Sequence, residues 1–143
     1  KGLYGYTDVG RVEKKCITIS ARGTIGYSEI REPNFLPIVR LIVAIPKTDV
    51  IIIEYLKHFF DYKNFSNTGS SIPQLTVPMV KQYIVPVPPL SEQTQISNKL
   101  DDILELAEKT IQLIERKLES FEELKQSILQ EAFSGKLTGG ITA

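Results

Sequence analysis

The feature that most constrains the fold is a run of more than forty residues, 90–134, that contains neither glycine nor proline. It follows a Pro-Pro pair at 88–89, and because proline cannot occupy a helix interior, this pair fixes where a helix can begin. Ser91 is a favourable N-cap for such a helix. We therefore predict one helix from about 92 to 133 that ends before Gly135.

The apolar residues of this predicted helix recur at heptad spacing over about four heptads, which is typical of a coiled coil. They form a strip of two adjacent rows, which consists of Leu100, Leu104, Ala107, Ile111, Ile114, Leu118, Phe121 and Ile128. Lys125 interrupts one row near its end. An isolated helix would leave the strip exposed to water, so we expect it to pair with another helix. No other predicted helix is long enough, and the partner is therefore expected from another molecule or from sequence beyond this chain.

The residues before the Pro-Pro pair have the pattern of strands and loops. The segment "CITISARGTIGYSEI" (16–30) predicts two strands joined by a turn, in which Gly23 tolerates a positive φ. The nearly continuous apolar run "IVRLIVAI" (38–45) predicts a third strand that is buried on both faces and ended by Pro46. A fourth, short strand is predicted at "YIVPV" (83–87).

Two shorter helices are predicted among these strands. Thr48 and Asp49 are candidate caps for a helix over about 50–62, whose apolar residues have helical spacing. A short helix or turn is predicted near 77–82. The predicted fold class is α+β, with a small mixed α/β domain followed by one long, coiled-coil-forming α-helix.

The formal net charge of zero conceals two parts of opposite sign. Residues 1–90 carry 11 Lys/Arg and 7 Asp/Glu, a net charge of +4, whereas residues 91–143 carry 6 and 10, a net charge of −4. A basic domain joined to an acidic helix indicates partners of two kinds. Many protein surfaces reach +4 without binding nucleic acid, so the charge alone does not identify those partners.

The chain offers little of the chemistry that catalysis requires. Its single cysteine, Cys16, lies in a strand-like run and is interpreted as a packed core thiol, and one cysteine suits a reducing cytoplasm. His58 is the only histidine, so no metal site is expected, and no phosphate-binding glycine loop or other cofactor motif is present. Val87 and Leu90 flank the Pro-Pro pair where an adenine methyltransferase needs a polar and an aromatic residue. No apolar run reaches the roughly 18 residues of a membrane span, and we expect a cytoplasmic location.

Polar residues on the predicted turn and within 63–74 are suited to reading DNA. The candidate DNA-binding residues are Arg22, Thr24, Lys63, Asn64, Asn67, Ser70, Ser71 and Gln74. Arginine and lysine can contact guanine edges or phosphates, and asparagine and glutamine can pair with adenine. The same residue types are common in solvated loops, and Gln74 could instead bond to the backbone of its own turn, so composition leaves both interpretations open.

Four ordered blocks resemble one half of the specificity subunit of type I restriction-modification enzymes. They are "ISARGTIG" (19–26), "GSSIPQLT" (69–76), "IVPVPPLSEQTQI" (84–96) and "LKQSILQEAFSGKLT" (124–138). The Pro-Pro-Leu-x-Glu-Gln block and the Ala-Phe-x-Gly-Lys-Leu ending are specific in combination, and the similarity covers about 16–138. Halves of such subunits have more residues before the first block than this chain has, so we expect the N-terminal part of the domain to be missing.

The resemblance implies a DNA target-recognition domain over 1–90, a conserved spacer helix over 91–134 and a C-terminal tail over 135–143. It implies a subunit without catalysis of its own that reads one half of a bipartite target in double-stranded DNA. Its partners would be methyltransferase (modification) subunits, which use S-adenosylmethionine, and through them ATP-driven restriction subunits. The helix would pair with that of a second recognition half or an identical chain, and set the gap between half-sites. The ending "EAFSGKLT" would be a contact for the modification subunit.

A second hypothesis is a coiled-coil scaffold whose small domain binds only protein. It shares the heptad pattern and accounts for the acidic helix. It leaves the basic domain and its Lys/Asn/Ser/Thr-rich segment unexplained. Salt-dependent retention on duplex DNA separates the two hypotheses, because release of counterions predicts a steep fall of affinity with salt.

Overall fold

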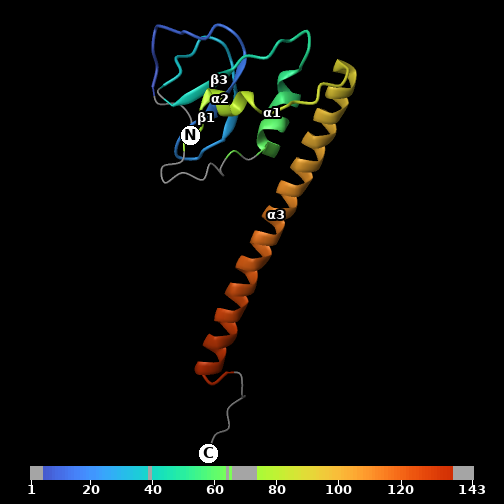
Figure 1. The fold of residues 1–143 in the computed structure, drawn as a ribbon. Coiled ribbons are helices and arrows are strands. Elements are labelled where there is room, and N and C mark those ends of the chain that lie inside the picture. Colours follow the sequence, from blue (N-terminus) through green and yellow to red (C-terminus); the bar gives the residue numbers. More distant parts are fainter. Residues whose placement is uncertain (1–4, 39, 64, 66–73, 137–143) are drawn as a thin grey trace, which may run out of the picture. The chain divides into compact units, whose positions relative to one another are not determined.

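The computed structural model describes residues 5–38, 40–63, 65 and 74–136. Its elements in chain order are β1 (Cys16–Ser20), β2 (Ser28–Arg31), β3 (Leu41–Ala44), α1 (Ile53–Lys63), α2 (Val77–Lys81) and α3 (Leu90–Phe133) (Figure 1). The chain divides into two compact units, Lys1–Leu100 and Asp101–Ala143, and α3 runs from the first into the second. We call the first unit without its α3 residues the head. The predicted α+β class is confirmed.

The head is built on a three-stranded antiparallel sheet of order β2-β1-β3. Ile17 in β1 pairs with Ile30 on one side and with Ala44 on the other. The central strand is deeply buried, since both Ile17 and Ile19 are fully inaccessible to solvent. The predicted strand-turn-strand over 16–30 is confirmed. Gly23 in the turn has φ of +74°, a conformation that residues other than glycine rarely adopt.

Two strand predictions failed: the one over 38–45 was wrong in part, and the one over 83–87 was wrong entirely. The apolar run 38–45 forms only the four-residue β3, which is half-buried rather than buried on both faces. Among the described residues β3 pairs only with β1, so it is an edge strand, and Arg40 before it has φ of +80°. The segment 83–87 forms no strand. Pro86 has no N–H to give to a sheet, and its carbonyl oxygen instead accepts a bond from the hydroxyl of Tyr55 at 3.1 Å.

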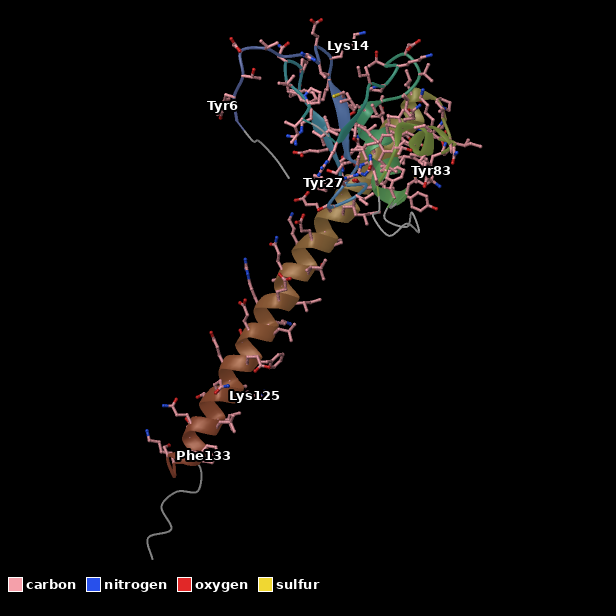
Figure 2. The ribbon with its side chains drawn as sticks, turned by 60° about the vertical axis from the view of Figure 1, so that its left-hand side comes forward. Tyr6, Lys14, Tyr27, Tyr83, Lys125 and Phe133 are labelled. Atoms are coloured by element: carbon pink, nitrogen blue, oxygen red, sulfur yellow. The ribbon has the colours of Figure 1, made fainter. Side chains whose placement is uncertain are left out.

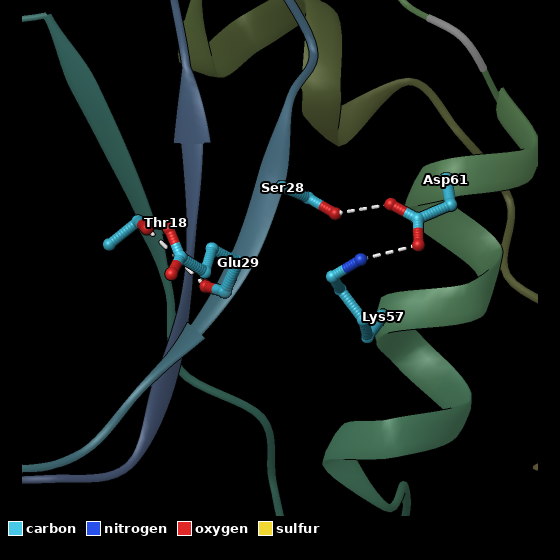
Figure 3. A network of polar contacts seen from close by, with 5 residues as sticks. All are labelled: Thr18, Ser28, Glu29, Lys57 and Asp61. Atoms are coloured by element: carbon cyan, nitrogen blue, oxygen red, sulfur yellow. Dashed lines mark hydrogen bonds and ion pairs between the residues drawn. The ribbon is translucent and has the colours of Figure 1, made fainter. Parts of the chain in front are cut away.

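The helix α1 packs against β1 and β2 and closes the core of the head. Its buried residues, Ile53, Leu56 and Phe60, have the spacing of one helical face. A polar network joins the same elements (Figure 3): the hydroxyl of Ser28 donates to Asp61 Oδ1 at 2.7 Å, and Asp61 also pairs with Lys57. The helix was predicted over 50–62, and the short helix predicted near 77–82 is α2.

The predicted caps Thr48 and Asp49 do not begin α1. They lie in a turn in which the amides of Val50 and Ile51 both donate to the carbonyl oxygen of Lys47, each at 2.9 Å. The helix therefore begins later, at Ile53.

The long helix α3 has 44 residues, which corresponds to about 66 Å. It begins at Leu90 rather than at 92, because the carbonyl oxygen of Pro89 accepts from the amides of Glu92 and Gln93 at 2.9 and 3.0 Å. The prediction that Ser91 is the N-cap was therefore wrong, since this residue lies inside the first turn. The prediction that the Pro-Pro pair fixes the start is confirmed.

The end of α3 has the bonds of a Schellman motif. Gly135 has φ of +74°, its amide donates to Ala132 O at 3.3 Å, and the amide of Lys136 donates to Glu131 O at 3.1 Å. The predicted stop before Gly135 is confirmed. None of the described helices is both long and apolar enough to cross a membrane.

Candidate functional site

Arg22 and Gln74 lie 52 residues apart in the sequence and are brought together at the end of β1. Gln74 Oε1 accepts hydrogen bonds from Arg22 Nε at 3.1 Å and from Arg22 Nη2 at 2.7 Å. Both residues are exposed. The sequence left open whether Gln74 would bond to the backbone of its own turn. Its described partner is instead the side chain of Arg22, which comes from the other segment.

The remaining described candidates lie on neighbouring segments. Thr24 is exposed on the turn after Arg22, and its carbonyl oxygen accepts from the amide of Tyr27 at 3.1 Å. The turn closely approaches Phe65, two residues after the end of α1, since a Cβ on Gly26 would lie 2.9 Å from Phe65 Cβ. The end of α1 carries Lys63, so three predicted residues come from segments that meet.

Lys63 is half-buried among aromatic rings. Its ammonium group lies 4.9 Å from the ring centroid of Tyr62, 5.4 Å from that of Phe59 and 5.9 Å from that of Tyr83. The ring faces carry partial negative charge and attract the cation, which restricts its position. Phe65 also packs edge-on against Tyr83 at 5.0 Å between centroids, so the same aromatic cluster joins the turn and the lysine.

Four predicted DNA-binding residues lie outside the described residues. They are Asn64, Asn67, Ser70 and Ser71.

The joint between the head and α3 depends on Gln93, whose side chain is fully buried. Its Oε1 accepts from the amide of Ile52 at 2.9 Å, and its Nε2 donates to the carbonyl oxygens of Val50 at 3.0 Å and Pro88 at 2.7 Å. One side chain thus links the segment before α1, the Pro-Pro pair and the first turn of α3. Ser97, one turn further on, is 2% exposed, and its hydroxyl has no hydrogen-bond partner among the described atoms.

The importance of Gln93 was missed in the sequence, although a signal was present. Counting back by heptads from Leu104 and Leu100 reaches Ser97 and Gln93. The helix face that carries the apolar strip therefore continues upstream, but polar residues occupy it there. A glutamine at such a position can bond to backbone groups of a neighbouring segment, as Gln93 does.

Side chains project from α3 along its length (Figure 2), and those of the apolar strip are exposed. Leu104 is 54% exposed, Ile111 56%, Leu118 59% and Phe121 66%. Burying a leucine or isoleucine side chain is worth about 1.5–3 kcal/mol, so a strip of this size favours a partner surface. Outside the strip the helix carries many charged residues, with i,i+4 pairing of Glu105 and Lys109 as one example, and further exposed apolar residues such as Leu106 and Leu113.

The sulfur of Cys16 has the environment of a core residue. Cys16 is fully buried, and burial raises the pKa of its thiol, which the positive charge of Arg31 partly opposes. The interpretation as a packed core thiol is confirmed. No group of three or more His, Cys, Asp or Glu that could hold a metal ion occurs among the described residues.

Comparison with known proteins places the sheet, the joint and the long helix in one family. A family model for the type I restriction modification DNA specificity domain matches residues 1–120. The chain belongs to this family. The resemblance predicted from the four sequence blocks is therefore confirmed, and the long helix is consistent with a coiled coil in this family.

Three curated relatives of this specificity domain come from Mycoplasma pneumoniae and are named as type I specificity subunits. S.MpnORF507P is 40% identical over 99 residues, which cover 69% of this chain and 27% of that protein. S.MpnORF89P is 42% identical over 98 residues, which cover 68% and 29%. The protein named as the C-terminus of S.MpnORF289P is 42% identical over 98 residues, which cover 68% and 67%. The chain thus spans less than a third of two of these relatives.

A solved structure has the same fold as this specificity domain. It comes from work on complex assembly and conformational transition of the type I R-M system. The TM-score is 0.76 at 21% identity, and the match covers 92% of this chain and 33% of that chain.

Proposed function

We propose that this chain is a DNA-reading half of a type I specificity subunit. Residues 1–90 act as the target-recognition domain, and 91–134 act as a spacer helix, followed by a tail over 135–143. The head reads one half of a bipartite target in double-stranded DNA, and the helix sets the distance to the other half. The chain carries no catalytic residue and instead holds modification subunits, and through them restriction subunits.

The observation that carries the DNA-reading proposal is the exposed Arg22, whose guanidinium is oriented by two hydrogen bonds to Gln74. Arginine donors suit both guanine edges and phosphates, and a cation that is already oriented loses less entropy on binding. Lys63, restricted by aromatic rings on a neighbouring segment, adds a second cation. The net charge of +4 on residues 1–90 supports the same partner.

The exposed strip of α3 supports helix pairing. The eight strip residues fit heptad positions, and pairing would remove them from water. In a complete subunit the second helix would come from the other recognition half. For this chain alone we propose a two-fold pair of identical chains, which mimics the two halves.

The DNA-reading proposal is tested by measuring affinity for a mixed-sequence DNA duplex at several salt concentrations. Counterion release predicts that the logarithm of affinity falls linearly with the logarithm of salt, with a slope near −0.9 for each phosphate contacted. Arg22→Ala should weaken binding. The matched control is Arg11→Ala, because Arg11 is also exposed but precedes β1, whereas Arg22 follows it. If Arg22→Ala and Arg11→Ala bind like the unaltered chain, Arg22 does not contact DNA.

The pairing proposal is tested by the mass of the chain in solution, measured by sedimentation equilibrium. Replacing both Ile111 and Leu118 by Asp places charge inside the strip and should leave a monomer. The matched control replaces Gln112 and Ser120 by Asp, which adds the same charge at exposed positions away from the strip and should leave the dimer. A dimer that survives the strip substitution removes the pairing assignment.

A protein-binding scaffold without DNA binding is the alternative, and the exposed strip alone would support it. It predicts that the chain pairs through α3 but shows no salt-dependent affinity for duplex DNA. The two measurements therefore separate the proposals, since one reports on the head and the other on the helix.

A further inference from the structure

The backbone around the Arg22–Gln74 pair is fixed on both sides of the contact. The carbonyl oxygen of Ala21 accepts from the amide of Leu75 at 2.9 Å, and the amide of Ala21 donates to Arg40 O at 2.9 Å. Ala21 is 4% exposed and Leu75 is 2% exposed, so both neighbours of the pair are anchored in the core. Arg22 and Gln74 are thus exposed side chains on two backbone segments that are anchored in the core.

The identity of the Gln74 atom that faces Arg22 follows from chemistry. Arginine has only donors, and the amide nitrogen of glutamine is also a donor, so only the amide oxygen can bond to the guanidinium. Gln74 Oε1 accepts from Nε and Nη2, which lie on one edge of the guanidinium plane. Of the five N–H groups of Arg22, these contacts leave both on Nη1 and one on Nη2. Those groups include the parallel pair at the tip of the side chain.

The same geometry limits what Gln74 can do by itself. To pair with adenine, a glutamine must accept from N6 with its oxygen and donate to N7 with its nitrogen. The oxygen of Gln74 is already shared by two donors of Arg22, so Gln74 is poorly suited to read adenine. Its described contacts instead orient the arginine.

We propose that Arg22 and Gln74 form one reading unit, in which Arg22 donates its Nη1/Nη2 pair to O6 and N7 of a guanine and Gln74 is a positioning residue for Arg22. The proposal rests on the proposed DNA-reading function. Two features support it: Arg22 is exposed, and the next residue, Gly23, has no described atom within 4 Å of the position of a Cβ, which leaves room among the described residues for a base edge to approach the turn. A phosphate would accept from the same donor pair, and the experiment distinguishes the two acceptors.

The experiment selects bound duplexes from a pool with a randomised centre, using the full chain. The enriched duplex and variants with each guanine replaced are then compared for affinity at several salt concentrations. The variants are Arg22→Lys, Gln74→Met, which has similar length but no acceptor, and Gln74→Glu, which keeps the acceptor and loses the amide donor. The matched control is Gln82→Met, at an exposed glutamine after α2.

The proposal expects one guanine in the selected sequence whose replacement lowers affinity by roughly 5- to 150-fold, the range for one bidentate base contact. We call the affinity for the selected duplex divided by that for the duplex with this guanine replaced the guanine ratio. Arg22→Lys and Gln74→Met should reduce the guanine ratio. Gln74→Glu and Gln82→Met should preserve it, even if the added charge of Glu weakens binding to all duplexes.

Four results overturn it. If Gln74→Met keeps the guanine ratio, Gln74 does not position Arg22. If Gln74→Met and Gln74→Glu both alter preference for adenine instead, Gln74 reads DNA directly. If Arg22→Lys leaves the guanine ratio intact and only changes the affinity for all sequences and the salt slope, Arg22 binds phosphate. If the unaltered chain retains no duplex at low salt, the DNA-reading function itself fails, and this outcome is separate from the other three.

Discussion

Replacing Gln93 by leucine should destabilise the head substantially, although leucine is of similar size and a better helix former. The change removes the acceptor for the Ile52 amide and the donor for the carbonyl oxygens of Val50 and Pro88. An unsatisfied buried group costs about 1–3 kcal/mol. The amide is the costlier loss, about 2 kcal/mol, because it has one hydrogen, whereas each carbonyl costs about 1 kcal/mol. Burial of the leucine offsets about 1–2 kcal/mol, so the free energy of unfolding should fall by about 2–3 kcal/mol.

Urea unfolding followed by tyrosine near-UV circular dichroism measures this loss. The chain has no tryptophan, and all six tyrosines precede residue 91, so the signal reports on the head and is insensitive to the long helix. The matched control is Gln95→Leu, the same change at an exposed position of the same helix, which should alter stability by no more than about 0.5 kcal/mol. If Gln93→Leu is also within that range, the three bonds do not hold the joint and the reasoning is wrong.

Three further predictions concern the first compact unit, Lys1–Leu100. Because burial raises the pKa of the Cys16 thiol, the contribution of this thiol to stability should be constant below the ordinary thiol pKa of 9.0 and be lost at higher pH. Iodoacetamide should modify Cys16 only in urea, and rapid modification of the folded chain would contradict the burial of the thiol. Gly26→Ala should reduce the urea midpoint more than Gly23→Ala, since both residues have positive φ but only a Cβ at Gly26 meets Phe65; equal midpoints would refute the close approach. Ser97→Ala should leave the free energy of unfolding unchanged or raise it by about 1 kcal/mol, because it removes a buried hydroxyl without a described partner; a loss above about 1 kcal/mol would mean that the hydroxyl is bonded.

Much of the fold could be predicted because local rules decide it. The Pro-Pro pair and Gly135 fix the ends of α3 within two residues, and the turn glycine at Gly23 fixes the first hairpin. The errors arose where tertiary position decides. The apolar run 38–45 reads as a central strand, but its place at the sheet edge follows from pairing between distant segments, and 83–87 is rich in strand-forming residues without having a strand to pair with.

The candidate site was predictable by residue type but not by arrangement. Arg22 stood out as a cation on a glycine turn, and the order of the sequence blocks pointed to the family. That Gln74 bonds to Arg22 depends on a backbone contact across 52 residues, which no local pattern encodes. The heptad pattern placed Gln93 on the face of the strip, but its role was overlooked because its three partners lie on segments that only the folded chain brings together.

All three partners of the Gln93 side chain are main-chain atoms, and this has a consequence for how the protein can diversify. Every residue offers a carbonyl oxygen at position 50, and every residue except proline offers an N–H at position 52, so the bonds of Gln93 do not depend on which other side chains stand there. The side chains at these two positions can therefore change while the bonds of Gln93 to the main chain are kept. One side-chain amide can thus hold heads of differing sequence, provided each returns the same backbone to the same place.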